Sequence, residues 1–292
     1  FTKSEATQTV TEAGVTDTFT LKLNAEPASN VVLRVTSADT GEVTVGAADY
    51  TFTTANWDTT QTVTLTGIDD AIVDTDTQTT VTITVVDDSS DNNFDAVANQ
   101  TVTVTTTDDE TAGFTKTQTT RTVTEAAGGG NTATFTLVLD EKPATDVVLN
   151  VVSADTGEVT VGAADYTFTT ANWNVAQTVT LTGIDDAIVD TDTETTVTIS
   201  VTDDSSNDEY DDVANQTVTV TTTDDETAAF TKSEATQTVT EAGVTDTFTL
   251  VLGAKPASDV VLRVTSADTG EVTVGAADYT FTTANWNSAQ TV

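Results

Sequence analysis

The sequence predicts an all-β chain of tandem two-sheet sandwiches arranged as a rod, and three observations predict it. Valine and threonine are stiff at χ1 and favour a pleated surface, and threonine alone makes up about a quarter of the 292 residues. Apolar and polar residues alternate in short runs separated by turn sequences. The whole pattern returns after about 115 residues, so one unit is repeated along the chain.

The repeat predicts the domain organisation. The opening Phe1-Thr2-Lys3 returns at Phe114 and again at Phe230, with spacings of 113 and 116 residues. The three-residue difference is a Gly-rich insertion around Ala127 to Gly130. Such a unit is too long for a solenoid repeat and matches one immunoglobulin-like sandwich of about 100 residues. We therefore expect three repeats: the first at 1–113, the second at 114–229, and an incomplete third at 230–292.

Within a repeat, period-two alternation predicts the strands in order. An opening strand is followed by runs in which one face is apolar and the other is mostly threonine. Turn sequences such as 24–27 and 37–41 separate these runs. Strands at such intervals form two sheets that pack face to face. The runs in the first repeat are 19–23, 31–35, 63–66, 81–85 and 102–105.

Aromatic residues recur at fixed places and are predicted to lie in the core or at its edge. Ligand stacking is the less favoured interpretation of these side chains. The tyrosine and tryptophan of this set return in the second and third repeats at Tyr166, Trp173, Tyr279 and Trp286. The set in the first repeat is Phe19, Tyr50, Phe52, Trp57 and Phe94.

The third repeat ends at Val292, the counterpart of Val63, and so lacks about three strands. We expect that it cannot bury a full core by itself and that the chain is a piece of a longer polypeptide. The first and third repeats differ at only seven of their 63 shared positions. Such sameness suits an array whose role is length and uniform mechanics, with stability close to a sum of unit and neighbour terms.

The charge of the chain limits its partners. The net charge is −38, with only nine basic residues, which argues against nucleic acid or an anionic membrane and favours multivalent cations. Cysteine is absent, so metal binding replaces disulfides as the expected support of exposed domains. An apolar run of about 20 residues would be needed to cross a bilayer, and we expect no membrane insertion in this segment. An export signal would lie outside it.

Acidic residues concentrate at Glu12, at Asp49, at 69–76 and at 108–110. If successive strands run up and down, all four groups reach the same end of the sandwich. Crowded carboxylates repel one another unless their pKa values rise or a cation binds. Calcium accepts many oxygen ligands in flexible geometry, whereas magnesium needs a tight octahedron and zinc or copper prefers His or Cys. The alternative is a set of solvated surface acids, but their convergence in two repeats favours calcium.

Four motifs, in order and spacing, resemble the Calx-beta domain of sodium–calcium exchangers and tandem bacterial surface proteins. They are 10–14 (VTEAG), 46–50 (GAADY), 67–70 (GIDD) and 108–110 (DDE). The resemblance covers each complete repeat from end to end. It implies calcium ligation by the Glu after the first strand, the Asp before Tyr, and the paired Asp of the loop. It also implies a nearby backbone carbonyl, a further loop acid (here Asp74, where the family usually has Glu) and the final acidic run.

The ligands that this resemblance implies are the same set in both complete repeats. In the first repeat they are Glu12, Asp49, Asp69, Asp70, Ile72 (through its carbonyl), Asp74, Asp108 and Asp109. In the second repeat they are Glu125, Asp165, Asp185, Asp186, Ile188 (through its carbonyl), Asp190, Asp224 and Asp225.

The function expected from these observations is a structural, calcium-binding repeat region of a secreted or cell-surface protein, such as an adhesin stalk or an extracellular filament. Its partners would be calcium ions and neighbouring repeats, with lateral or end-to-end self-association into fibres left open. Ions would bridge consecutive repeats, with help from acidic loops at the opposite end (87–91 and 203–208).

Two other functions stay open at this point. One is a glycan- or protein-binding module, and the other is a non-catalytic spacer of an extracellular hydrolase. Catalysis by the chain itself is not expected, because histidine and cysteine, the commonest bases and nucleophiles, are absent. Paired carboxylates can hydrolyse glycosides, but nothing in the sequence predicts a cleft lined with aromatic side chains.

Overall fold

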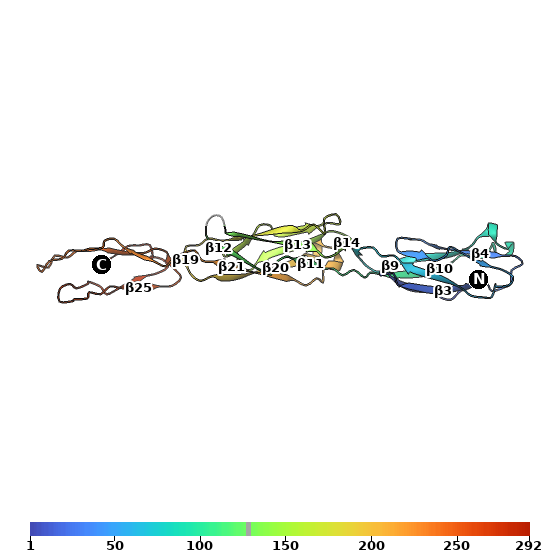
Figure 1. The fold of residues 1–292 in the computed structure, drawn as a ribbon, viewed down its shortest axis with the longest axis horizontal. Coiled ribbons are helices and arrows are strands. Elements are labelled where there is room, and N and C mark those ends of the chain that lie inside the picture. Colours follow the sequence, from blue (N-terminus) through green and yellow to red (C-terminus); the bar gives the residue numbers. More distant parts are fainter. Residues whose placement is uncertain (127–129) are drawn as a thin grey trace.

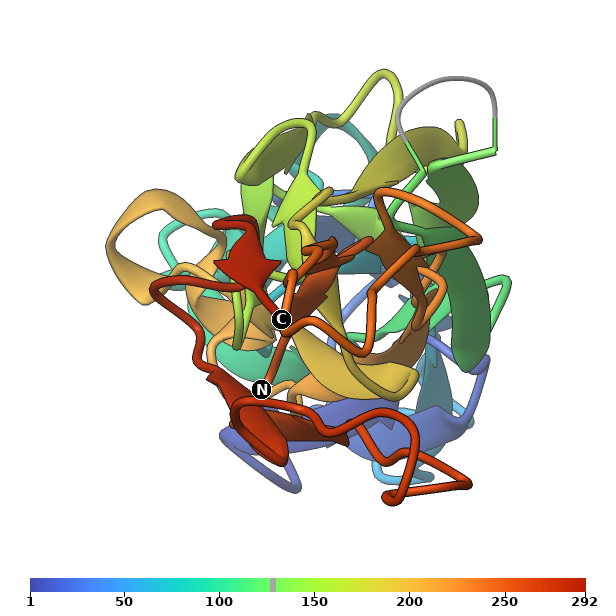
Figure 2. The same ribbon diagram turned by 90° about the vertical axis from the view of Figure 1, so that its left-hand side faces the viewer.

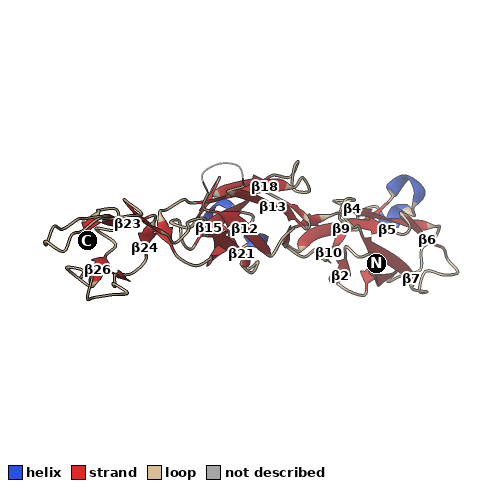
Figure 3. Cartoon of the chain, turned by 60° about the vertical axis from the view of Figure 1, so that its left-hand side comes forward, coloured by secondary structure: helices blue, strands red, loops and turns tan. Residues whose placement is uncertain are grey.

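The computed structural model of the protein describes residues 1–126 and 130–292. Strands joined by turns make up the fold, and helix in these described ranges is confined to single 3-10 turns (Figure 3). The three repeats follow one another along the long axis (Figure 1), and they overlap when viewed down that axis (Figure 2). The prediction of an all-β, rod-like chain is confirmed. Of the predicted insertion around Ala127 to Gly130, only Gly130 lies within the described residues.

The first repeat is a sandwich of two sheets. One has the strand order β1-β3-β7-β5 and the other has the order β2-β10-β9-β4-β6. Neighbouring strands are antiparallel except β2 and β10, which are parallel. The strand bounds are β1 (Thr2–Lys3), β2 (Thr7–Thr11), β3 (Thr16–Lys22), β4 (Val31–Ser37), β5 (Val43–Val45), β6 (Asp49–Phe52), β7 (Gln61–Gly67), β8 (Ile72–Val73), β9 (Thr77–Val85) and β10 (Gln100–Thr107), with 3-10 turns η1 (Asp87–Ser89) and η2 (Asn92–Phe94).

Alternation along each strand sorts the side chains between core and solvent. In β7, Val63 and Leu65 are fully buried between the sheets. Threonines on the outer faces stand opposite one another, as Thr18 does to Thr64. Such cross-strand pairs contribute about 0.2–1 kcal/mol each. The aromatic prediction is confirmed: Phe19, Tyr50 and Phe52 are buried, and Trp57 and Phe94 pack against the core from its edge.

The second repeat has the same topology, with sheets ordered β11-β13-β18-β16 and β12-β21-β20-β15-β17. Its 3-10 turns are η3 (Asp203–Ser205) and η4 (Asp208–Tyr210). The strand bounds are β11 (Phe114–Lys116), β12 (Thr120–Thr124), β13 (Thr132–Leu139), β14 (Lys142–Pro143), β15 (Val147–Ser153), β16 (Val159–Val161), β17 (Asp165–Phe168), β18 (Gln177–Gly183), β19 (Ile188–Val189), β20 (Thr193–Val201) and β21 (Gln216–Thr223).

The third repeat forms only part of a sandwich. It contains a three-stranded sheet β22-β23-β27 and the pair β25-β26. Its buried core is reduced, and Phe230 is 56% exposed although its counterpart Phe114 is 3% exposed. The strand bounds are β22 (Phe230–Lys232), β23 (Thr249–Leu252), β24 (Lys255–Pro256), β25 (Val260–Arg263), β26 (Asp278–Phe281) and β27 (Gln290–Thr291).

Consecutive repeats are joined by paired strands as well as by the continuous chain. Strand β8 of the first repeat pairs in parallel with β14 of the second, and β19 pairs with β24 in the same way. Val73 in β8 is 2% exposed and belongs to the core cluster of the second repeat. Burying a valine side chain contributes about 1.5–3 kcal/mol. The junction is therefore a packed interface. No helix in the described residues is long and apolar enough to span a membrane.

Candidate metal centre

Strand ends bring the acidic segments of the first repeat together. Strand β2 ends at Thr11 opposite Thr107, the last residue of β10, because these two strands are parallel. Strand β9 begins at Thr77 beside the same end of β10. The backbone amide of Glu12 donates to the Thr107 carbonyl at 3.1 Å. We name this end the acidic pole; its residues are Glu12, Glu42, Asp70, Asp74, Asp108, Asp109 and Glu110, with counterparts in the second repeat.

A close backbone approach positions two parts of the acidic pole. Gly67, the last residue of β7, lies against the backbone of Thr11, where a Cβ atom would collide with the Thr11 carbonyl. Gly183 stands in the same relation to Thr124. The next amide, that of Ile68, donates to the Glu42 carbonyl at 2.9 Å. Glycine at this position therefore lets the segments carrying Glu12 and Glu42 meet.

The carboxylates form close groups with the spacing of metal ligands. One oxygen each from Glu12, Asp109 and Glu110 lie within 4.8 Å of one another, and so do oxygens of Glu12, Asp74 and Asp108. Glu12 belongs to both groups. The matching group in the second repeat is Glu125, Asp225 and Glu226.

Several of these oxygens are buried and have no hydrogen-bond donor. Glu12 is only 4% exposed, and its Oε2 atom has no partner. Burying an unpaired charge is costly, and buried polar atoms in proteins are normally satisfied. An all-oxygen set with unsatisfied buried atoms fits calcium, which prefers carboxylate and carbonyl ligands. The other such oxygens belong to Glu42, Asp74, Asp108 and Glu110, and in the second repeat to Glu125, Glu158 and Glu226.

Crowding and burial change the acidity of the cluster. Burial raises the pKa of Glu12 to about 7, and the neighbouring carboxylates of Asp70 and Asp108 add to the rise. Burial, with a hydrogen bond to Glu110, raises the pKa of Asp108 to about 7. The pKa of Glu125 is likewise raised to about 7, first by burial and then by Asp190 and other acids. Without a cation, the ionised cluster therefore works against folding.

Most of the residues that the resemblance implies lie at the acidic pole. Asp69 and Asp185 are exposed in the pole's loops, and neither belongs to the close carboxylate groups found among the described residues. Ile72 and Ile188 lie in the short strands β8 and β19, which pair with the next repeat. The residues in close groups or in charge contact with them are Glu12, Asp70, Asp74, Asp108 and Asp109, and Glu125, Asp186, Asp190, Asp224 and Asp225.

Asp49 and Asp165 lie away from the acidic pole. Asp49 forms two hydrogen bonds with Arg34, at 2.7 Å from Nε and 2.8 Å from Nη2. In the second repeat, Asp165 accepts a 2.7 Å hydrogen bond from Asn150 Nδ2. Strand β6 begins at Asp49 opposite Arg34, which in turn pairs with Thr84 near the far end of β9. The up-and-down argument misplaced this group because it left out β5, which leads the chain away from the acidic pole before β6 begins.

Glu42 and Glu158 occupy the place in the cluster that the sequence assigned to Asp49 and Asp165. The pKa of Glu42 is raised by burial and then by Asp74, Asp39 and Asp70. Glu42 stands at the start of β5, where Val43 pairs with Gly67. The sequence holds a signal for it: the segment DTGEV recurs at 39–43, 155–159 and 268–272. This signal was missed because Glu42 is a single acid and not part of a run of adjacent acids.

The junction places acids of the next repeat near the pole. A cavity of about 370 Å³ is lined from the first repeat by Val73, Asp108, Glu110, Thr111 and Ala112 and from the second by Glu209, Asp212, Val213 and Ala214. The acids of the second repeat that line it are therefore Glu209 and Asp212. The predicted loop 203–208 does not contribute to this lining.

Asp91, in the other loop predicted to help bridge repeats, has a local role. Its carboxylate accepts hydrogen bonds from the amides of Ala28, Ser29 and Asn93. These backbone donors lower its pKa. Asp91 is therefore a satisfied carboxylate that fastens the loop at 28–29 to η2.

No family model matches the sequence, and no curated protein matches it. The chain is similar to the calcium-binding domain CBD12 of CALX1.1, at 13% identity over 75% of this chain and 98% of that one, with a TM-score of 0.32.

Two further solved structures are similar at the same level. CBD12 from CALX1.2 matches at 15% identity over 66% of this chain and 77% of that one, with a TM-score of 0.26. Domains 4 and 5 of the S-layer protein SbsC match at 16% identity over 65% and 70%, with a TM-score of 0.30. With likenesses this low, the assignment of an immunoglobulin-like two-sheet sandwich rests on the strand order of the repeats themselves.

Proposed function

We propose that this chain is a calcium-binding structural repeat region of a secreted or cell-surface protein, in which calcium stiffens the junctions between repeats. One observation carries the proposal: buried carboxylate oxygens without donors gather at the end of each complete repeat that meets the next one. We also propose that the repeats are domains with bounds 1–113, 114–229 and, for the partial one, 230–292.

The acidic pole of each complete repeat would hold the calcium. Its carboxylates supply the oxygens that calcium prefers, and the bound ion supplies the positive charge that offsets their mutual repulsion. Because Glu12 belongs to two close groups, we infer that it bridges two ions. The Ile72 carbonyl and Asp69 stay in the proposed set on the resemblance alone. The proposed side-chain ligands are Glu12, Glu42, Asp69, Asp70, Asp74, Asp108, Asp109 and Glu110, and in the second repeat Glu125, Glu158, Asp185, Asp186, Asp190, Asp224, Asp225 and Glu226.

Charge at the junction supports the stiffening role. Asp108 and Glu110 line the same cavity as Glu209 and Asp212 of the next repeat. Four carboxylates around one cavity repel one another, which opposes close contact between the repeats. A divalent cation on the first repeat's side offsets the charge of two carboxylates and so weakens this repulsion. The cation therefore favours the docked arrangement.

Thermal unfolding tests the proposal. Saturating calcium should raise the melting midpoint by at least about ten degrees over the same protein in chelator, because each saturated site contributes about 2.7–4 kcal/mol. Magnesium at equal concentration is the control and should raise the midpoint less, because it resists dehydration and demands octahedral geometry. Equal midpoints in calcium and chelator, with no heat of calcium binding by calorimetry, would refute it.

A further inference from the structure

The short strand β8 belongs to the loop of the acidic pole, and it also pairs with β14 of the next repeat. Asp70 and Asp74 flank the segment that contains it, and the Ile72 amide donates to Asp70 Oδ1 at 2.7 Å. Val73 pairs with Pro143 and is buried in the same cluster as the core of the second repeat. One two-residue strand therefore contacts both the candidate metal centre and the neighbouring repeat.

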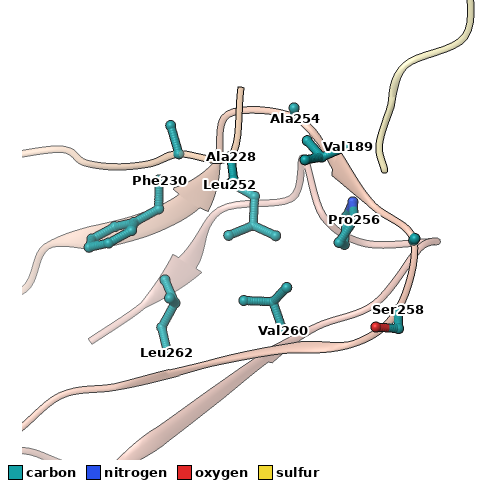
Figure 4. A pocket seen from close by; sticks show the side chains of 11 residues that line it. Val189, Ala228, Phe230, Leu252, Ala254, Pro256, Ser258, Val260 and Leu262 are labelled. Atoms are coloured by element: carbon teal, nitrogen blue, oxygen red, sulfur yellow. The ribbon is translucent and has the colours of Figure 1, made fainter. Parts of the chain in front are cut away.

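The second junction repeats this arrangement. Ile188 pairs with Lys255 and Val189 with Pro256, and the Lys255 amide donates to the Ala187 carbonyl at 3.1 Å. Figure 4 shows Val189 beside Pro256 at an apolar cavity of about 390 Å³. Its other lining side chains include Phe230, Leu252, Val260 and Leu262.

At the first junction, Val73 belongs to a core cluster that involves two residues with no counterpart in the partial third repeat. Tyr210 is fully buried, and its hydroxyl donates to the Glu141 carbonyl at 2.7 Å. Val213 packs against the same core cluster. Residues 230–292 hold no counterpart of Tyr210 or Val213, and Val189 lines an open apolar cavity, whereas Val73 is only 2% exposed.

We propose that the Ile-Val strand of the acidic pole is a docking strand, and that the apolar end of the following repeat is its specific receptor. Val73 and Val189 are then the residues that couple the metal centre to the joint. The coupling half of this proposal rests on the proposed calcium function, while the docking half does not. Ordering of the loop by a cation holds the strand in place for docking, and docking in turn holds the loop in place for the cation, so the two events favour each other.

One charged position of the receptor differs between the repeats that meet a docking strand and the first repeat. The residue that pairs with the docking-strand isoleucine is Lys142 at the first junction and Lys255 at the second. The same position in the first repeat, whose receptor end meets no docking strand in this chain, is Glu26. Lysine at this position adds positive charge to a junction whose cavity is lined by Asp108, Glu110, Glu209 and Asp212, and so offsets part of their repulsion.

A distance measurement on the full chain tests the proposal. The chain contains no cysteine, so Thr80→Cys and Thr196→Cys, two exposed and equivalent positions, accept spin labels uniquely. In calcium, the distance distribution between the labels should be narrow in the parent and at least twice as wide after Val73→Asp. Val152→Asp, which puts the same charge on a valine that is 53% exposed, should leave the width unchanged.

The outcomes separate docking from calcium binding. Calorimetry on Val73→Asp should show the calcium stoichiometry retained with weaker affinity at the first repeat, as reciprocal coupling requires. A distribution as narrow as that of the parent would overturn the docking role. If the parent binds no calcium, the proposed function fails and the width in Val73→Asp still decides docking. Val73→Ala, which removes contacts without adding charge, is the second variant and should give an intermediate width.

Discussion

We expect Glu12 to contribute to stability with opposite signs in the presence and absence of a cation. Its buried carboxylate has an oxygen without a donor and several acidic neighbours. We expect Glu12→Gln to raise the melting midpoint in chelator, because the amide removes a buried charge at constant size. The same change should lower both the calcium affinity and the midpoint in calcium, because a bridging ligand is lost. Calorimetry and thermal melts measure the two effects.

Asp49→Asn is the matched control for that experiment. It also replaces an acid by its amide, but at an exposed pair with Arg34. Exposed salt bridges contribute about 0–1 kcal/mol, and the second repeat has Asn150 in place of the arginine. We therefore expect little change in the midpoint and none in calcium affinity. A loss of affinity in Asp49→Asn would return this residue to the metal site.

The raised pKa values predict how stability in chelator depends on pH. Folding raises the pKa of Glu12 and Glu125 to about 7 from an ordinary value of 4.5. A group with a raised folded-state pKa stabilises the fold below its unfolded pKa, and this stabilisation is lost as the pH rises through the folded pKa. The melting midpoint in chelator should therefore rise as the pH falls from about 8 to about 5.

Calcium should reverse much of that pH dependence. The ion binds the deprotonated carboxylates and competes with protons, so the gain in midpoint on adding calcium should be largest near pH 8 and shrink toward pH 5. Thermal melts across this range, with and without calcium, measure it. A midpoint in chelator that falls steadily as the pH drops over this range would contradict the buried cluster.

At the scale of elements, the acidic pole depends on the contact between β7 and the end of β2. Gly67→Ala puts a methyl group against the backbone of Thr11, and overpacking of this kind costs about 1–3 kcal/mol. We expect a lower urea midpoint for the first repeat and weaker calcium binding, because Glu12 follows Thr11 directly.

Gly46→Ala is the control for this contact. Its added Cβ would meet Thr64 at 3.5 Å, an ordinary van der Waals distance. The urea midpoint and the calcium affinity should therefore stay close to those of the parent. Equal behaviour of the two variants would show that the close approach of β7 and β2 does not position the cluster.

At the scale of the whole molecule, we expect the rod to be stiff in calcium and flexible without it. Small-angle scattering should show a smaller average maximum dimension in chelator, because junctions with unneutralised acids on both sides no longer stay docked. Sodium chloride at matched ionic strength is the control, since it screens exposed charges but cannot coordinate the buried oxygens. An unchanged maximum dimension after chelation would remove the stiffening role.

Much of this architecture could be predicted from the sequence. Threonine alternating with valine in runs such as 102–105 predicts which face of a strand is buried, and the burial of β7, β9 and β10 follows this alternation. Glu12 and the 108–110 run were placed at one end because they directly follow strands. Asp49 was misplaced and Glu42 missed because both depend on how a short edge strand pairs, which local alternation does not reveal.

The sequence by itself determined the repeat, the sandwich and the acidic character of its ends, because these follow from periodicity and composition. Only the tertiary structure decided which carboxylates share a site, since that depends on the β2–β10 register and on Gly67 meeting Thr11. It also decided that Val73 belongs to the core of the next repeat. Val73 is buried by apolar residues of the following repeat, so its burial cannot be predicted from the pattern within a single repeat.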